Sequence, residues 1–258
     1  MFTIDLSGKV VLISGAGAGI GLGIARQMAL AGATVCGADL HPAPGAFAAV
    51  LQITGTTGCY TCCDVTSTAD LQRWIDTVAE QFGRIDILVS NAGANVFTGA
   101  AESSEEDWQR NIDLNLKAHW QLARLCKPWL EQQQGVIILV TSNHAFQSIP
   151  GCFPYDVAKT ALTGLVRSLA VEWAPQVRTV GIAPGFIDTP GNQQWFDGFA
   201  DPAQERQRTI GLHPVGKIGT TEEIGGWCVF LSSPYAGFAA GVTYLVDGGR
   251  SALMQTRG

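Results

Sequence analysis

Tyr155 and Lys159 stand four residues apart in the stretch from Phe153 to Lys159, where a helix is expected to begin. This spacing puts a phenol and an ammonium group on the same face of a helix. A phenol that is withdrawn from water beside a cation can ionise near neutral pH and act as a base on an alcohol. Lowering the pKa of a tyrosine from about 10 to about 7 corresponds to roughly 4 kcal/mol of preferential stabilisation of the phenolate. Ser142, at the end of the apolar run that precedes Tyr155, could hydrogen-bond the same reacting oxygen.

A glycine-rich stretch from Ser14 to Gly21 lies between a predicted strand and a predicted helix. Glycines let the backbone turn tightly and approach a pyrophosphate, while the helix N-terminus offers amide donors and the positive end of its dipole. A Gly-x-Gly-x-x-Gly pattern alone often marks only a tight turn, but its place between strand and helix favours a dinucleotide site. The candidate cofactor residues in this stretch are Ser14, Gly15, Gly19, Ile20 and Gly21.

Asp39 closes the second predicted strand and bears on the choice between NAD and NADP. A carboxylate at this place can accept hydrogen bonds from both hydroxyls of the adenosine ribose, and it repels a 2′-phosphate. Leu40 and His41 follow it, and the glycine loop holds no Arg or Lys that would neutralise such a phosphate. The pattern therefore favours NAD, with Asp39 and Leu40 as candidate contacts. An ordinary helix-capping role for Asp39 is the alternative.

Short apolar runs alternate with helical patterns along the chain. Strands without strict polar alternation, separated by helices, indicate a parallel sheet covered on both faces. We therefore expect an α/β fold, a Rossmann-like doubly wound parallel sheet of about seven strands, in one domain over residues 1–258. The stretch 186–214 is long, irregular and aromatic, and we interpret it as a substrate lid. The expected strands are 9–14, 33–38, 58–63, 85–90, 136–141, 177–183 and 242–246, and the expected helices are 20–31, one from about 43, 71–82, 105–133, 155–173 and 221–232.

Composition and charge narrow the classes of function. A net charge of −6 argues against a nucleic-acid partner, which would need a basic stripe. The apolar runs are all shorter than the roughly 20 residues that span a bilayer, and the first residues do not read as a signal peptide, so we expect no membrane association. The seven cysteines lack the paired spacing of a metal site, and reduced thiols in the cytoplasm are the simplest interpretation.

With these motifs in place, the chain resembles the short-chain dehydrogenase/reductase family across essentially its full length. The glycine stretch resembles the family's Thr-Gly-x-x-x-Gly-Ile-Gly, with Ser14 in place of Thr. The resemblance implies a catalytic tetrad of Asn115, Ser142, Tyr155 and Lys159, in which Asn115 would hold a water that links Lys159 to solvent. Asn111 lies on the same helical face as Asn115 but lacks the motif context. The resemblance also implies cofactor contacts at Tyr155 and Lys159 and at Asp64, Val65, Asn91, Ala92, Gly93, Pro184, Gly185, Ile187 and Thr189.

The implied reaction transfers a hydride between a secondary alcohol and nicotinamide, with Tyr155 as general base or acid. The stretch from Pro184 to Asn192 resembles that of family members acting on sugars and polyols, and we expect a substrate of this class. Amides and an imidazole suit a polyhydroxylated ligand, although each of these side chains could equally serve loop or lid packing. The candidate substrate contacts are Asn95, Ser142, His144, Phe146, Phe153, Tyr155, Gln193 and Trp195.

Other functions remain open. Trp195, Phe196 and Phe199 favour a hydrophobic secondary alcohol such as a steroid, whereas a reductase of carrier-bound acyl chains would want NADP and a basic docking patch. A non-catalytic protein that only senses dinucleotide would be expected to lack a tetrad residue. The family resemblance further implies a homo-oligomer, a dimer or tetramer, formed through the helices at 105–133 and 155–173. Trp120 and Trp129 are candidate contacts there or else core residues.

Overall fold

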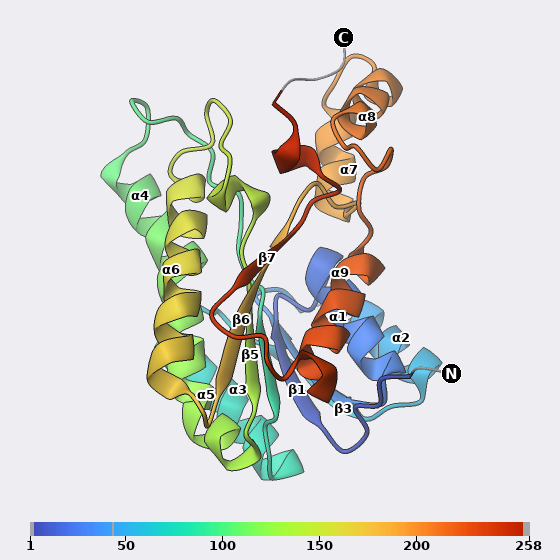
Figure 1. Cartoon of the computed structure of the whole chain (residues 1–258), viewed down its shortest axis with the longest axis vertical. Coiled ribbons are helices and arrows are strands. Elements are labelled where there is room, and N and C mark those ends of the chain that lie inside the picture. The colour runs from blue at the N-terminus through green and yellow to red at the C-terminus, as the bar shows by residue number, and fades with distance from the viewer. Residues whose placement is uncertain (1–2, 43, 255–258) are drawn as a thin grey trace.

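A seven-stranded sheet forms the centre of the computed structural model, which describes residues 3–42 and 44–254 (Figure 1). The strand order is β3-β2-β1-β4-β5-β6-β7, and every neighbouring pair is parallel. This arrangement confirms the predicted fold class. The order reverses between β1 and β4, and in such sheets ligands bind beyond the carboxyl ends of the strands at this switch point. The strands are β1 (Val10–Ser14), β2 (Thr34–Asp39), β3 (Gly58–Cys62), β4 (Ile87–Ser90), β5 (Val136–Val140), β6 (Arg178–Pro184) and β7 (Thr243–Val246).

Helices cover both faces of the sheet. Ile24, Phe47 and Ile224 belong to one core, which packs α1 (Gly19–Leu30), α2 (Pro44–Thr54) and α9 (Thr221–Ser232) against the sheet. Trp74, Leu122 and other buried residues form the second core, under α3 (Thr68–Phe82), α5 (Ala118–Gln133) and α6 (Tyr155–Trp173). The two groups of helices lie on opposite sides of the sheet in Figure 1. Because β1, β4 and β5 are buried on both faces, their sequences are apolar without alternation.

The expected helix at 105–133 is interrupted. It consists of α4 (Glu105–Ile112), a π-helical turn η1 (Asp113–Lys117) and α5, so the predicted helical region is present but is not one regular α-helix. A π-helical turn inserts an extra residue into the hydrogen-bond ladder, and such turns often occur at functional sites.

The stretch 186–214 is not irregular, which corrects that part of the prediction. It contains α7 (Pro190–Asp197) and α8 (Pro202–Gly211), which stand above the carboxyl ends of the strands (Figure 1). Thr189 and Asp201 cap these helices, and a proline follows each cap at the first helical position. This start signal is present in the sequence, but both helices are too short to show a clear period.

The predicted starts of two other helices agree more closely with the structure. The helix expected at 221–232 is α9, and a capping box forms its start: Glu223 N donates to Thr220 Oγ1 (3.2 Å), and Thr220 N donates to Glu223 Oε2 (2.9 Å). The helix expected from about residue 43 is α2, although residue 43 itself lies outside the described residues. Within the described part of the chain, no helix is long and apolar enough to span a bilayer, and no group of three or more His, Cys, Asp or Glu could hold a metal ion.

Candidate active site

Tyr155 and Lys159 occupy the first two turns of α6, and both side chains are buried. Lys159 Nζ lies 5.5 Å from the centroid of the Tyr155 ring and donates a hydrogen bond to Val140 O (3.3 Å) at the end of β5. Thr141 Oγ1 donates to Lys159 O (2.7 Å), which fixes the helix against the strand. The structure therefore brings the phenol and the ammonium group together, on the face of the helix that points to the sheet.

The electrostatics of this pair differ from the expectation. Burial raises the pKa of Tyr155 to about 12, a shift that a hydrogen bond with Ser142 partly opposes. Burial also lowers the pKa of Lys159 to about 8. Both shifts favour the neutral side chains, because a low-dielectric surrounding disfavours charge. In the protein alone, the pKa of Tyr155 therefore lies above its ordinary value although Lys159 is nearby.

Ser142 follows β5 and is buried close to the tyrosine. Its hydroxyl accepts a hydrogen bond from His144 N (3.2 Å) and donates to Asn143 Oδ1 (3.4 Å). The His144 ring lies edge-on to Tyr155, with 6.2 Å between ring centroids. Phe97 packs edge-on against the same tyrosine at 5.3 Å. The rings of His144 and Phe97 therefore pack edge-on against the phenol ring of Tyr155 and shield part of it from water.

Asn115 lies in the middle of the π-helical turn and is fully buried. Its side chain makes two hydrogen bonds with the backbone of Ala94, from Nδ2 to the carbonyl (2.9 Å) and from Ala94 N to Oδ1 (3.2 Å). Asn115 Nδ2 also donates to Asn111 Oδ1 (3.0 Å), and Asn111 Nδ2 donates to Pro154 O (2.7 Å). This chain of bonds links the loop after β4 to the residue that precedes Tyr155. Asn111, to which the sequence assigned no role, is therefore part of the support of the site, and its spacing of four from Asn115 was the available signal.

Gly93 lies where Asn115 and Lys159 approach each other. A Cβ at this position would be 2.7 Å from Asn115 Oδ1 and 3.3 Å from Lys159 Nζ. Only a glycine leaves both side chains in place here.

The glycine stretch forms the turn between β1 and α1, as expected. Gly15 and Gly19 have φ angles of +67° and +52°, and a Cβ on Gly21 would collide with the Gly15 carbonyl. Ala18 precedes α1 and brings no polar side chain to its first amides. Ile20 lies in the first turn of that helix. These amides are therefore available to an anionic ligand.

The side chains of Ser14 and Asn91 hold this turn against the loop after β4. Ser14 Oγ accepts hydrogen bonds from Asn91 N (2.9 Å) and Ala92 N (3.1 Å), and Asn91 Nδ2 donates to Ser14 O (3.0 Å). Since the Ser14 hydroxyl is buried and engaged in this way, its role in the structure is to position the loop.

Asp39 ends β2 at the same edge of the sheet. Its carboxylate accepts hydrogen bonds from Gly17 N (3.0 Å) and, more weakly, from His41 N (3.4 Å). Leu40 is exposed beside it, and α2 begins only at Pro44, which argues against a helix cap. Asp64 follows β3 and accepts from Thr66 N (2.8 Å), and the neighbouring Val65 is buried.

The segment after β6 faces the glycine turn. Gly185 N donates to Val246 O (3.0 Å), and a Cβ at Gly185 would collide with Asp247. Ile187 is buried, and its carbonyl accepts a hydrogen bond from Asn192 Nδ2 (2.7 Å). The Thr189 methyl group lies 3.5 Å from the position of a Cβ on Gly19. The start of α7 and the start of α1 therefore meet across the site.

The predicted substrate residues do not all lie beside Tyr155. Asn95 and Phe146 are exposed, and Gln193 donates to Asp188 Oδ1. Trp195 packs against Phe186, Phe196 and Phe199 within the segment 186–214. Phe153 stacks on Trp108 of α4, with 5.6 Å between ring centroids. The structure thus places His144 beside Tyr155, whereas Gln193, Trp195 and Phe153 are held by neighbours of their own.

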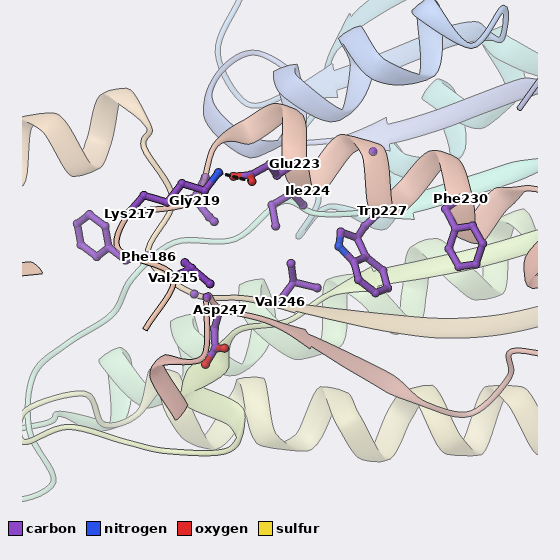
Figure 2. A pocket seen from close by; sticks show the side chains of 14 residues that line it. Phe186, Val215, Lys217, Gly219, Glu223, Ile224, Trp227, Phe230, Val246 and Asp247 are labelled. Atoms are coloured by element: carbon purple, nitrogen blue, oxygen red, sulfur yellow. Dashed lines mark hydrogen bonds and ion pairs between the residues drawn. The ribbon is translucent and has the colours of Figure 1, made fainter. Parts of the chain in front are cut away.

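A cavity of about 510 Å³ lies between α9 and the ends of β6 and β7, and the predicted cofactor residues Gly185 and Ile187 are among the residues that line it. Figure 2 shows Trp227, Val246 and Ile224 around it, with the Lys217–Glu223 ion pair at its rim. α9 covers the opposite face of the sheet from α6, so Tyr155 does not line this cavity.

Comparisons with known proteins identify the family of this chain. A family model described as Enoyl-(Acyl carrier protein) reductase matches residues 15–251. The chain is 35% identical over 249 residues to Dehydrogenase/reductase SDR family member 4 of Homo sapiens, covering 95% of this chain and 88% of that protein. It is 34% identical to D-threitol dehydrogenase of Mycolicibacterium smegmatis, covering 96% and 95%. The solved structure of Thermoplasma acidophilum aldohexose dehydrogenase superposes with a TM-score of 0.90 at 28% identity, covering 100% and 99% of the two chains.

The match covers the glycine turn, the buried tetrad and nearly the whole sheet, and the family it identifies consists of oxidoreductases that use nicotinamide cofactors. The chain belongs to the short-chain dehydrogenase/reductase family.

Proposed function

We propose that this protein is an NAD-dependent dehydrogenase that oxidises a secondary alcohol of a sugar or polyol, with Tyr155 as the general base. The observation that carries the proposal is the gathering of Tyr155, Ser142, Lys159 and Asn115 at the carboxyl ends of β4 and β5, next to the glycine turn. The similarity to a D-threitol dehydrogenase and to an aldohexose dehydrogenase supports a hydroxylated substrate.

The glycine turn fits a dinucleotide. Its close backbone approaches leave no room for Cβ atoms at Gly15 and Gly21, and the first amides of α1 can bind a pyrophosphate. Asp64 and the loop Asn91–Ala92–Gly93 would line the adenosine side, and Thr189, beside Gly19, would bind the nicotinamide amide. When bound, oxidised NAD supplies the acceptor of the hydride.

Asp39 supports NAD over NADP. Its carboxylate lies at the end of β2 within hydrogen-bond distance of the glycine turn, where an adenosine ribose would bind. Leu40 and His41, which follow it, bring no full positive charge to bind a 2′-phosphate.

The proton of the substrate hydroxyl passes to Tyr155. Ser142 donates a hydrogen bond to the same oxygen and orients it, a contact that strengthens as negative charge develops. Because burial holds the pKa of Tyr155 at about 12 in the protein alone, we propose that the phenolate forms only when a positive charge is placed beside it, as in the complex with the oxidised cofactor. Lys159 and a water held near Asn115 then return the proton to solvent.

A hydrophobic alcohol such as a steroid is the second candidate. The aromatic cluster of Trp195, Phe196 and Phe199 in the segment 186–214 favours it, and we propose that this segment closes over the substrate as a lid. A protein that only senses dinucleotide is disfavoured, since the four tetrad residues are present and buried together.

We further propose a homo-oligomer and a cytoplasmic location. Trp120 and Val171 are exposed on α5 and α6, which suits a helical interface between copies, while Trp129 packs against the core. The seven cysteines are free thiols, as expected in a reducing compartment.

The test is NADH formation by the purified protein with NAD, followed by absorbance against a panel of polyols, aldoses and hydroxysteroids. Tyr155→Phe should lower turnover by roughly 10²–10⁴-fold without weakening NAD binding, the loss expected for a general base. Tyr235→Phe, at an exposed tyrosine, is the matched control. Equal turnover by Tyr155→Phe and the control would refute the role of Tyr155.

A further inference from the structure

The turn η4 (Arg250–Ala252), which follows β7, lies in the gap between the loop after β5 and the helices α7 and α8 (Figure 1). It is firmly attached on one side, because Gln147 Nε2 donates to Ser251 O. The Asp247 carboxylate accepts hydrogen bonds from Gly249 N (3.0 Å) and Ser251 N (2.7 Å), which fixes the shape of the turn. The turn therefore forms part of the rim at the carboxyl end of the sheet.

Arg250 is a half-buried cation that lacks a hydrogen-bonded partner among the described residues. Other arginines of the region are matched: Arg206 pairs with Asp188 (2.8 Å) and Arg208 with Glu205 (2.6 Å). The nearby Asp247 carboxylate is already used by backbone amides. Burial lowers the pKa of Arg250, and the charge of Arg208 lowers it further, with Asp247 opposing. A desolvated cation of this kind is stabilised by an incoming anion.

Three polar atoms in this turn and in the segments beside it are buried without a hydrogen-bond partner in the described structure: His144 Nδ1, His213 Nε2 and Ser251 Oγ. His213 is 3% exposed, and its Nδ1 bonds to Thr209 O (2.8 Å), which requires the proton on Nδ1 and leaves a lone pair on Nε2. After burial, the charge of Arg250 is among the causes that lower the pKa of both His144 and His213. The printed contacts place the turn of Arg250 between the two histidine segments: Gln147, three residues after His144, donates to Ser251 O, and the Cβ position of Gly248 lies 3.5 Å from His213.

This cluster is close to the reacting centre. The His144 ring contacts the Tyr155 ring, and His144 is two residues after Ser142. His144 therefore lies at the reacting centre and in the same loop as Gln147, which is bonded to the turn that carries Arg250. The lone pair on His213 can accept a hydrogen bond from a further hydroxyl group of the same ligand.

We propose that Arg250, together with His144 and His213, binds a carboxylate of the substrate, so that the preferred substrate is a polyhydroxy acid and not a neutral polyol. A single free guanidinium group matches a carboxylate, which it can bind with two parallel hydrogen bonds. A phosphate ester, with up to two negative charges, would favour a second free cation, and Arg208 is already paired with Glu205. This inference rests on the proposed dehydrogenase function and specifies its substrate class.

The experiment compares matched substrates, gluconate with glucitol and threonate with threitol, by kcat/KM at saturating NAD. The wild-type protein should prefer the acid of each pair. Arg250→Gln should lower the ratio of kcat/KM for acid over polyol by roughly 10- to 100-fold, the loss expected for a hydrogen bond to a charged group. Arg250→Lys should keep part of this preference, because the charge remains and the paired geometry is lost. Arg167→Gln, at an exposed arginine of α6, should leave the ratio as in the wild type.

The outcomes separate this inference from the proposed function. Oxidation of glucitol and threitol with no preference for the acids, or an unchanged ratio in Arg250→Gln, overturns the carboxylate site and leaves the dehydrogenase intact. Preference for glucitol 6-phosphate over gluconate also overturns it. Calorimetric binding of gluconate to the protein loaded with NADH adds a readout without turnover: it should be tighter in the wild type than in Arg250→Gln, and equal affinity refutes the site. Failure to oxidise any alcohol on a broad panel refutes the proposed function itself.

Discussion

Asn111 offers the sharpest test of how the site is supported. Its side chain is fully buried and makes two hydrogen bonds, to Pro154 O (2.7 Å) and from Asn115 Nδ2 (3.0 Å). Asn111→Ala leaves one N–H of the buried Asn115 amide without a partner, while Pro154 O keeps the hydrogen bond from Ala158 N (3.3 Å). An unsatisfied buried group costs about 1–3 kcal/mol, so we expect a loss of about 1–3 kcal/mol in the free energy of unfolding. For a chain of this size, that loss lowers Tm by roughly 2–12 °C.

The same substitution should slow turnover. Pro154 immediately precedes Tyr155, and Asn115 holds the backbone of Ala94, so both sides of the site lose an anchor. A displacement of a catalytic group by about 1 Å can cost about 100-fold in rate, and we expect kcat to fall by this order while KM for NAD changes little.

Thermal unfolding at fixed protein concentration and NADH formation are the two assays, since an oligomer would make Tm depend on concentration. Gln72→Ala is the matched control. Gln72 Nε2 donates to Asp76 Oδ1 (2.8 Å), a bond between residues four apart like that of Asn111 and Asn115, but on the exposed surface of α3. It should cost only about 0.2–0.5 kcal/mol. If Asn111→Ala matches this control in both Tm and turnover, the reasoning from the buried bonds is refuted.

Three further variants probe cofactor choice, packing and protonation. Asp39→Ala should reduce the preference for NAD over NADP by about tenfold or more, measured as the ratio of kcat/KM values, because the carboxylate that repels a 2′-phosphate is removed. Gly93→Ala should abolish most turnover while NAD still binds, because its Cβ would displace Asn115 Oδ1 (2.7 Å). Lys159→Met should change the pH dependence of the free energy of unfolding. Burial lowers the pKa of Lys159 from 10.5 to about 8, so between these two pH values the folded state binds fewer protons than the unfolded state. The free energy of unfolding of the wild type therefore rises with pH through this window. The rise amounts to roughly 3 kcal/mol in the wild type and should be absent from the pH profile of Tm in the variant.

Each of these variants has a control in the chain. Asp76→Ala removes an exposed carboxylate on α3, and Gly164→Ala adds a methyl group on α6 where nothing lies within 4 Å. Lys127→Met removes a lysine that is paired with Glu131 near the surface of α5. An unchanged cofactor ratio in Asp39→Ala would remove this residue from the ribose site. Full activity in Gly93→Ala, or a rise of Tm with pH that persists in Lys159→Met, would likewise contradict the structural argument.

Much of the fold and of the tetrad could be predicted from the sequence because the deciding signals are local. The spacing of Tyr155 and Lys159 determines a shared helix face, whatever the helix packs against. Continuous apolar runs between helical patterns determine a parallel sheet, because both faces of each strand must be buried. The turn between β1 and α1 follows from glycines at positive φ, and the start of α9 from the capping box at Thr220.

Only the tertiary structure decided the features that depend on distant residues. Ser251, next to Arg250, is bonded to Gln147 because the chain returns to the carboxyl edge after β7, and no spacing in the sequence reports that approach. The π-helical turn at Asn115 is stabilised by bonds to Ala94, which belongs to another element. The direction of the pKa shift at Tyr155 is set by how completely the fold buries the phenol, and burial is a property of the packed chain as a whole. The local sequence determines which chemical groups are present and on which face of a helix or strand they lie. The distances between these groups and their removal from water are determined by the packing of the whole chain.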